Sequence, residues 1–184
     1  MTIKGSDYLD YELGMKKGLE LIIAKQNVNF GLLLVCGLNM GLRIGDLLTI
    51  SHKELSKGEF IIVEKKTSKK RKIVVNSTVK NALRLIPNVL HKKLERKCFI
   101  SKKGTVYSPQ HVNRLLKKYF ETDGIRISSH SMRKGYGRRY YEKYHNEGGL
   151  TDLQLQFNHS TPEVTLKYIG KTQDRLDSMY ERLV

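Results

Sequence analysis

The longest apolar run of the sequence, residues 30–38 (FGLLLVCGL), constrains the fold more than any other feature. It is too short to span a bilayer, which needs about 20 consecutive apolar residues, and Arg43 and Asp46 interrupt its extension. The run is therefore predicted to form a helix buried at the centre of a globular domain. The N-terminal ten residues contain no apolar signal segment, so we expect a cytoplasmic protein with no membrane partner.

Apolar spacing and capping residues predict that helices form most of the chain around this run. The expected helices cover residues 9–26, 30–38, 43–50, 78–86, 109–122, 130–144, 152–157, 164–168 and 174–183. Their expected N-caps include Ser77, Ser108, Ser128 or Ser129, Thr151 and Thr161.

Two runs rich in β-branched residues, 59–64 and 72–75, flank a polar basic segment and predict an antiparallel β-hairpin. The chain has 184 residues and no linker-like segment. It is predicted to be one domain, residues 1–184, of the mainly α (α+β) class with a small antiparallel β-sheet.

Positive charge is concentrated in one part of the chain. The 34 Lys and Arg exceed the 18 Asp and Glu by 16, and residues 65–143 alone hold 23 bases against four acids. Such a band favours a polyanionic partner, and nucleic acid is the commonest, because basic side chains release the counterions condensed on phosphates. A solvated basic face without a ligand is the alternative.

Several classes of catalytic motif are absent from the sequence. It has no glycine-rich phosphate loop, no HExxH, no CxxC and no dense cluster of carboxylates that could hold two Mg²⁺ ions. Cys36 and Cys98 both lie in apolar runs and indicate buried thiols, not a disulfide. We expect no metal and no cofactor, so any phosphoryl chemistry must use side-chain cations and a side-chain nucleophile.

A few polar residues occur where such chemistry could use them. Arg43 and Asp46 are three residues apart, as are His130 and Arg133, so each pair lies on one face of its expected helix. Taken alone, each pair also fits a surface ion pair or a polar helix end. The order along the chain is more informative: Arg43, Lys66 in the hairpin, His130 with Arg133, His159, and Tyr168 nine residues later.

In this order, four segments of the chain resemble the catalytic domain of the tyrosine recombinases, the phage integrase family. GLNMGLRIGDLLTI is similar to the first arginine box, and KKTSKKRKIVV to the hairpin that carries a lysine. HSMRKGYGRRYYE is similar to the His-x-x-Arg box, and FNHSTPEVTLKYIG to the segment that ends in the nucleophile. Asn158 replaces the usual glycine of the last box, and Gly170 replaces a frequent histidine.

The resemblance implies a DNA-breaking and rejoining enzyme that needs neither metal nor ATP. A tyrosine attacks the scissile phosphate of double-stranded DNA and leaves a 3′-phosphotyrosyl bond and a free 5′-hydroxyl. The resemblance implies that Tyr168 is the nucleophile and that Arg43, Arg133 and His159 are phosphate ligands. It implies that Lys66 is the general acid and that His130 is a proton-transfer group. Asp46 would support the arginine and the histidine. The DNA-binding residues expected from the basic band are Lys65, Lys69, Lys70, Arg71, Lys72, Lys134, Arg138 and Arg139.

The last residues, 171–184, are expected to form a tail helix with Leu176, Met179, Tyr180 and Leu183 on one face. The resemblance implies that this tail packs onto a neighbouring protomer and links four protomers on DNA. The alternative is a helix folded back onto its own core.

The sequence leaves alternatives open for the function of the protein and for its extent. A non-catalytic DNA-binding protein on the same scaffold, a type IB topoisomerase and a basic RNA-binding protein each explain part of the sequence. Family members usually carry a core-binding domain before the catalytic domain, whereas about 30 residues precede the central helix here. The chain is therefore either the catalytic half of a longer protein or a short stand-alone member like the fimbrial invertases.

Overall fold

The structure, a computed structural model, describes residues 5–86, 96–122 and 124–182. Its helices are α1 Tyr11–Ile23, α2 Val28–Met40, α3 Ile44–Leu47, α4 His52–Ser56, α5 Ser77–Arg84, α6 Pro109–Phe120, α7 Ser129–Tyr144, α8 Gly149–Phe157, α9 Pro162–Tyr168 and α10 Lys171–Glu181. A 3₁₀ turn, His145–Glu147, separates α7 from α8, and the strands are β1 Glu59–Val63 and β2 Lys70–Val74. The predicted class, mainly helical with a small antiparallel sheet, is confirmed.

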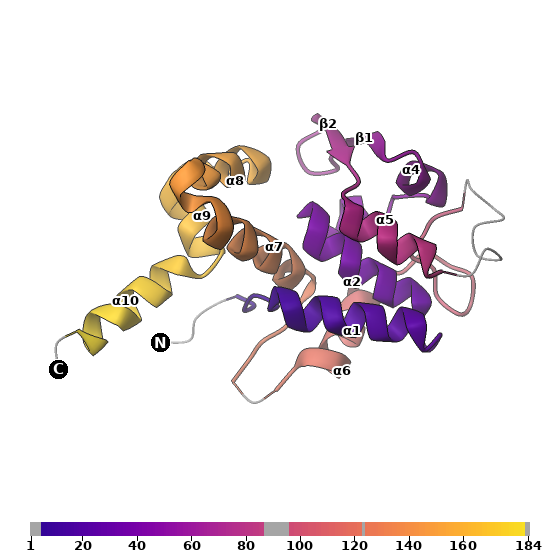
Figure 1. The fold of residues 1–184 in the computed structure, drawn as a ribbon, viewed down its shortest axis with the longest axis horizontal. Coiled ribbons are helices and arrows are strands. Elements are labelled where there is room, and N and C mark those ends of the chain that lie inside the picture. Colours follow the sequence, from indigo (N-terminus) through magenta and orange to yellow (C-terminus); the bar gives the residue numbers. More distant parts are fainter. Residues whose placement is uncertain (1–4, 87–95, 123, 183–184) are drawn as a thin grey trace.

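Helix α2 is the centre of the domain, as the apolar run predicts. Its residues Leu32, Leu33 and Leu34 are all 0% exposed, because α1, α5 and α7 pack around it (Figure 1). A helix that is apolar on every side is stable only when it is surrounded in this way. No helix in the described ranges is long and apolar enough to cross a membrane.

Glycines allow α1 and α2 to approach each other closely. A Cβ atom built on Gly31 would lie 2.5 Å from the carbonyl oxygen of Gly18, and one built on Gly18 would lie 3.0 Å from the carbonyl oxygen of Gly31. Gly18, a residue of low helix propensity within the expected helix 9–26, is therefore required by packing, which a local pattern does not show.

This contact predicts a loss of stability when a methyl group is added. Gly31→Ala should lower the free energy of unfolding by about 2 kcal/mol, because overpacking outweighs the gain of about 1 kcal/mol that alanine brings to a helix. Gly45→Ala is the control, since a Cβ atom there has only the Lys65 side chain at 3.8 Å. An equal shift of the thermal unfolding midpoint in both variants would contradict the explanation.

The strands of the β-hairpin are shifted relative to the sequence pattern: Glu64 lies outside β1, and Val75 lies outside β2. Lys70 and Arg71 pair with Val63 and Ile62, so β2 begins two residues before the predicted run 72–75. The buried side chains alternate on β1, which places Phe60 and Ile62 on the core. The six residues between the strands, 64–69, form the turn that is important below.

Several helix boundaries differ from those predicted. Asn76, not Ser77, caps α5, because its side chain accepts from the Val79 amide and Ser77 is already helical. Helix α8 begins at Gly149, so Thr151 lies inside its first turn and is not its N-cap. The predicted helix 43–50 is reduced to α3, and Leu183 lies outside the described residues.

Helix α4 was not predicted from the sequence. It begins at a capping box in which the Ser51 hydroxyl accepts from the Glu54 amide, and the Glu54 carboxylate accepts from the Ser51 amide. The box is a local signal that the sequence does contain. Cys36 and Cys98 are buried free thiols, as expected.

The C-terminal elements pack around the second half of α7. Helix α8 lies against α7, α9 lies against α8, and α10 extends away from them toward the C-terminus (Figure 1). Leu153, Phe157 and Ile169 form a small separate core there, with Tyr168 packed against it. This core fixes the end of α9 beside the beginning of α7.

Candidate active site

The candidate site lies where five separate segments end or begin. Arg43 precedes α3, Lys66 lies in the β1–β2 turn, and His130 and Arg133 lie near the beginning of α7. His159 follows α8, and Tyr168 is the last residue of α9. Residues separated by up to 125 positions in the sequence are thus collected at the ends of elements.

A left-handed turn at Gly41 places Arg43. Gly41 ends α2 with φ 59°, and a Cβ atom there would lie 2.4 Å from the Tyr136 ring, so glycine is needed for both reasons. The chain then leaves α2 in an extended conformation at Arg43. The Arg43 Nη1 donates to Glu64 Oε2 at 2.8 Å, and Nη2 donates to the Phe157 carbonyl oxygen at 3.3 Å.

Arg133 is the most buried cation of the site, with 3% of its surface exposed. Its Nη2 donates to the same Phe157 carbonyl oxygen at 3.3 Å, and its guanidinium lies 4.3 Å from the Phe157 ring centroid. The buried Nη1 has no hydrogen-bond partner among the described residues. Burial lowers the pKa of Arg133 to about 10, which leaves it charged at neutral pH.

The end of α8 holds these arginines together. Asn158 adopts the left-handed conformation, φ 54°, and ends the helix, which leaves the Phe157 and Gln156 carbonyl oxygens for guanidinium donors. Carbonyls at a helix C-terminus carry partial negative charge and stabilise cations. Asparagine is the usual substitute for glycine in this conformation, so Asn158 preserves the backbone that glycine would provide.

Tyr168 lies beside the two arginines. Its ring centroid is 5.4 Å from that of Phe157 and 5.1 Å from that of His159, and its hydroxyl is 3.5 Å from His130 Nδ1. Burial raises the pKa of Tyr168, and the charges of Arg133 and Arg43 oppose that rise. The cations therefore favour the phenolate form that a nucleophile needs.

Both histidines are suited to be neutral at pH 7. Burial, together with the nearby positive charges, lowers the pKa of His130 and of His159 below the ordinary value of a histidine. His159 Nδ1 lies 3.1 Å from Thr165 Oγ1, which fixes the ring. A neutral His130 next to the Tyr168 hydroxyl can accept its proton.

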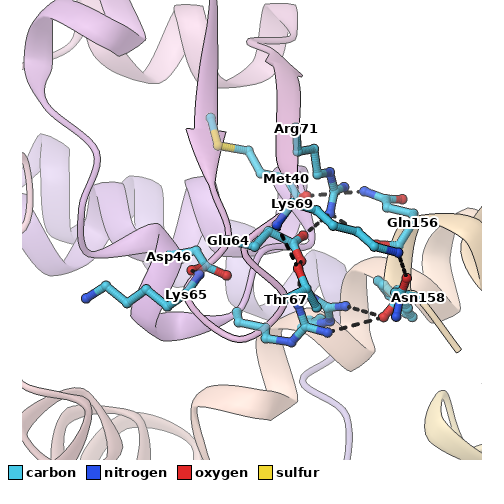
Figure 2. A network of polar contacts seen from close by, with 12 residues as sticks. Met40, Asp46, Glu64, Lys65, Thr67, Lys69, Arg71, Gln156 and Asn158 are labelled. Carbon is cyan, nitrogen blue, oxygen red and sulfur yellow. Dashed lines mark hydrogen bonds and ion pairs between the residues drawn. The ribbon is translucent and has the colours of Figure 1, made fainter.

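The structure does not bring Lys66 into contact with the other predicted catalytic residues. The side chain is exposed in the turn and forms no hydrogen bond or ion pair within the described ranges. Its charge nevertheless contributes to the lowered pKa of His130. Asp46, 2% exposed, accepts from the Lys65 amide at 2.9 Å, so it supports the hairpin turn (Figure 2). Its expected support of the arginine and the histidine stays a prediction.

The comparisons with known proteins agree with this arrangement. Residues 21–175 match the sequence model of the phage integrase family. The chain belongs to the phage integrase family. The family that the four segments resemble is thereby confirmed.

The chain is also similar to individual proteins. The probable integrase/recombinase YoeC of Bacillus subtilis (strain 168) is 28% identical over 154 residues, 81% of this chain and 81% of YoeC. XerA recombinase superposes with a TM-score of 0.68 at 16% identity over 95% of this chain. A lambda integrase dimer bound to a COC′ core site superposes with a TM-score of 0.64 at 15% identity over 90% of this chain. The chain spans 64% of the XerA chain and 60% of the lambda integrase chain, and these structural likenesses show the fold alone.

The predicted DNA-binding residues of this integrase-family chain fall into two groups. Those of the hairpin lie beside the site: Lys65, Lys69 and Lys70 are exposed, Arg71 donates to Gln156, and Lys72 pairs with Glu59. Those of α7 are occupied within the chain: Lys134 donates to the Ser6 carbonyl and lies over the Tyr168 ring, Arg138 pairs with Asp174, and Arg139 pairs with Glu12. A role in DNA binding stays a prediction for both groups.

The sequence did not indicate the contacts that Lys69 and Glu64 make in the site. Lys69 Nζ donates to Asn158 Oδ1 at 2.6 Å, which ties the hairpin to the end of α8 (Figure 2). Glu64 lies buried between Arg43 and Arg71. Burial alone would raise the pKa of Glu64, but the hydrogen bonds from Thr67 and Arg71 and the Arg43 charge hold it below the usual value. An acid directly before the run KKTSKKRK was the available signal.

Proposed function

We propose that residues 1–184 form the catalytic domain of a site-specific DNA recombinase, of integrase or invertase type, that works through a 3′-phosphotyrosyl intermediate. One observation carries the proposal: the guanidinium groups of Arg43 and Arg133 converge on the Phe157 carbonyl oxygen, and both lie close enough to Tyr168 for their charges to act on its hydroxyl. Two guanidinium groups next to a nucleophile fit the nonbridging oxygens of a phosphodiester. The lambda integrase dimer of similar fold is bound to a COC′ core site, which supports DNA as the partner.

The proposed first chemical step gives each of these groups a role. The Tyr168 oxygen forms a bond to phosphorus and gives its proton to His130, while the bond from phosphorus to the 5′-oxygen breaks. Lys66 supplies the proton that the departing 5′-oxygen takes up. Arg43, Arg133 and His159 stabilise the charge that develops on the other phosphate oxygens. The attack of a 5′-hydroxyl from a partner strand reverses these transfers and rejoins the DNA.

Covalent trapping tests this proposal. The wild-type protein is incubated in EDTA with half-site DNA from its own attachment site, and the products are separated on a denaturing gel. We expect an adduct that survives SDS, with the DNA attached to the peptide that contains Tyr168. Binding of this DNA without an adduct would contradict cleavage by residues 1–184 alone, and it would favour either a catalytic half that needs a further domain or a non-catalytic DNA-binding protein on the same scaffold.

The tail helix α10 is proposed to link protomers on DNA. Arg138 fixes its beginning through two hydrogen bonds to Asp174, whereas Leu176, Met179 and Tyr180 are 45%, 55% and 75% exposed. An exposed apolar face of this kind fits a neighbouring protomer better than its own core. Residues 171–184 would thus exchange between four protomers.

A charge on this face should block assembly without affecting cleavage. Met179→Glu is expected to reduce synaptic complexes at least tenfold in a native gel, because it places a carboxylate in the apolar interface. Cleavage of half-site DNA should stay at the wild-type rate. Arg182→Gln makes the same one-unit change in charge at the end of α10 and should assemble normally. Normal assembly of Met179→Glu would disprove the role of the tail.

A further inference from the structure

Glu64 is a buried carboxylate at the centre of a strongly cationic site. It follows β1 directly and is 5% exposed. Its Oε2 accepts from Arg43 Nη1 at 2.8 Å and from Thr67 Oγ1 at 2.8 Å, and its Oε1 accepts from Arg71 Nη1 at 3.3 Å (Figure 2). One carboxylate therefore joins an arginine of the site, a second arginine and the hairpin turn.

The charge of Glu64 has two opposing electrostatic effects. It offsets the repulsion between Arg43 and Arg71, which it pairs with, but it also weakens the attraction of Arg43 for a phosphate. The hydrogen bonds of the carboxylate give it a geometric role as well. Hydrogen bonds from three different segments fix the carboxylate, and through it they fix the positions of those segments relative to one another.

The backbone of Glu64 organises the same turn. Its amide donates to the Lys69 carbonyl oxygen at 3.0 Å, and its carbonyl oxygen accepts from the Ser68 amide at 2.8 Å. The turn is thus closed at its base, and Lys66 lies inside it. Because the Glu64 carboxylate also accepts from Thr67, the turn depends on both the backbone and the side chain of this one residue.

Asp46 holds the other side of the turn. Its Oδ1 accepts from the Lys65 amide, and Asp46 lies three residues after Arg43. The two neighbours of Lys66, Lys65 and Thr67, are therefore both hydrogen-bonded to buried carboxylates. Asp46 is close to Arg43 in the sequence, and Glu64 forms an ion pair with Arg43.

We propose that Glu64 is a positioning residue that fixes the Lys66 turn relative to Arg43. The proposal rests on the proposed function, in which Lys66 protonates the leaving 5′-oxygen and Arg43 binds the same phosphate. Glu64 itself touches neither the DNA nor the reacting atoms. It sets the distance between the acid and the phosphate ligand.

A DNA with a sulfur leaving group tests this role. A 5′-thiolate departs without an acid, because a thiol has a pKa of about 8.5, far below that of an alcohol. We expect Glu64→Ala to cleave ordinary DNA about 100-fold more slowly than wild type, as Lys66→Ala does, since general acid catalysis contributes at least this factor. On DNA with a 5′-bridging sulfur, both variants should come within about tenfold of wild type.

Two further variants sharpen the comparison. Glu59→Ala, on the same hairpin but exposed and paired only with Lys72 in the described chain, should cleave both DNAs like wild type. Thr67→Val removes the hydrogen bond from the turn to the Glu64 carboxylate and leaves the ion pair between Glu64 and Arg43. It should therefore slow only the cleavage of ordinary DNA. Equal losses on the two DNAs for Glu64→Ala, or no loss on either, would overturn the proposal.

Amide hydrogen exchange separates this inference from the proposed function. If the wild-type protein forms no adduct on either DNA, the recombinase function fails, but the position of the turn can still be measured. Glu64→Ala should accelerate exchange of the Lys65 and Ser68 amides at least tenfold, and Glu59→Ala should not. Unchanged exchange in Glu64→Ala would mean that Glu64 does not hold the turn.

Discussion

Replacing Tyr168 with phenylalanine is expected to abolish the covalent protein–DNA adduct, with a loss of at least about 10³-fold in cleavage. The substitution removes only the oxygen that would bond to phosphorus. Phenylalanine keeps the ring contacts to Phe157 and His159, and the hydroxyl lies at the outer limit of a hydrogen bond, 3.5 Å, from His130 Nδ1. Thermal stability and DNA affinity should therefore stay close to wild type.

The matched control is Tyr180→Phe, which removes a hydroxyl from a side chain that is 75% exposed on α10. It should form the adduct at the wild-type rate on a denaturing gel. An adduct that persists in Tyr168→Phe would assign the attack to another residue. Tyr136 is the first alternative, since its ring also packs against Phe157, although its hydroxyl donates to Gln156.

The elements with strong local signals were predictable from the sequence. The apolar run became α2, and the β-branched runs became the hairpin. Ser108 before Pro109, and Thr161 before Pro162, cap α6 and α9 as expected. Signals of this kind depend on residues within one turn of each other, which is why they can be read without a structure.

Partners that are distant in the sequence could not be predicted in the same way. The order of Arg43, Arg133 and Tyr168 indicated one site, but nothing local indicates that the Phe157 carbonyl would receive both arginines. Likewise, nothing local indicates that Asp46, which is predicted to support the arginine and the histidine, accepts from the Lys65 amide of the turn.

The partner of Arg138 within the chain shows the same limit. A basic residue in a basic band suggests DNA, and the sequence does not indicate that Arg138 also donates to Asp174 of α10. Composition indicates that cations are needed, and only the fold indicates which of them have partners within the chain.

Arg133→Lys is expected to slow DNA cleavage by about 10²–10³-fold while DNA binding is largely retained. Lysine keeps one positive charge but lacks the planar fork of donors that fits two phosphate oxygens at once. The Arg133 Nη2 donates to Phe157, and the buried Nη1 has no partner in the described chain, so the second donor is available for an anion. A lysine has its three donors on a single nitrogen, so it cannot occupy the separate positions of Nη1 and Nη2 at once.

The dependence on pH gives this variant a second signature. Burial depresses the pKa of a lysine, so the ammonium at position 133 should lose its proton as the pH rises, whereas the guanidinium, with a pKa of about 10, stays charged at neutral pH. The ratio of variant to wild-type cleavage rates should therefore fall between pH 6 and about 9.

Arg139→Lys is the control on the same helix, because the Arg139 side chain is 51% exposed and pairs with Glu12 away from the site. Its cleavage rate and pH profile should match those of the wild type. If Arg133→Lys cleaved as fast as Arg139→Lys, a point charge would be sufficient at position 133. The convergence of two guanidinium groups beside Tyr168 would then have no catalytic meaning, and the recombinase function would rest on family membership alone.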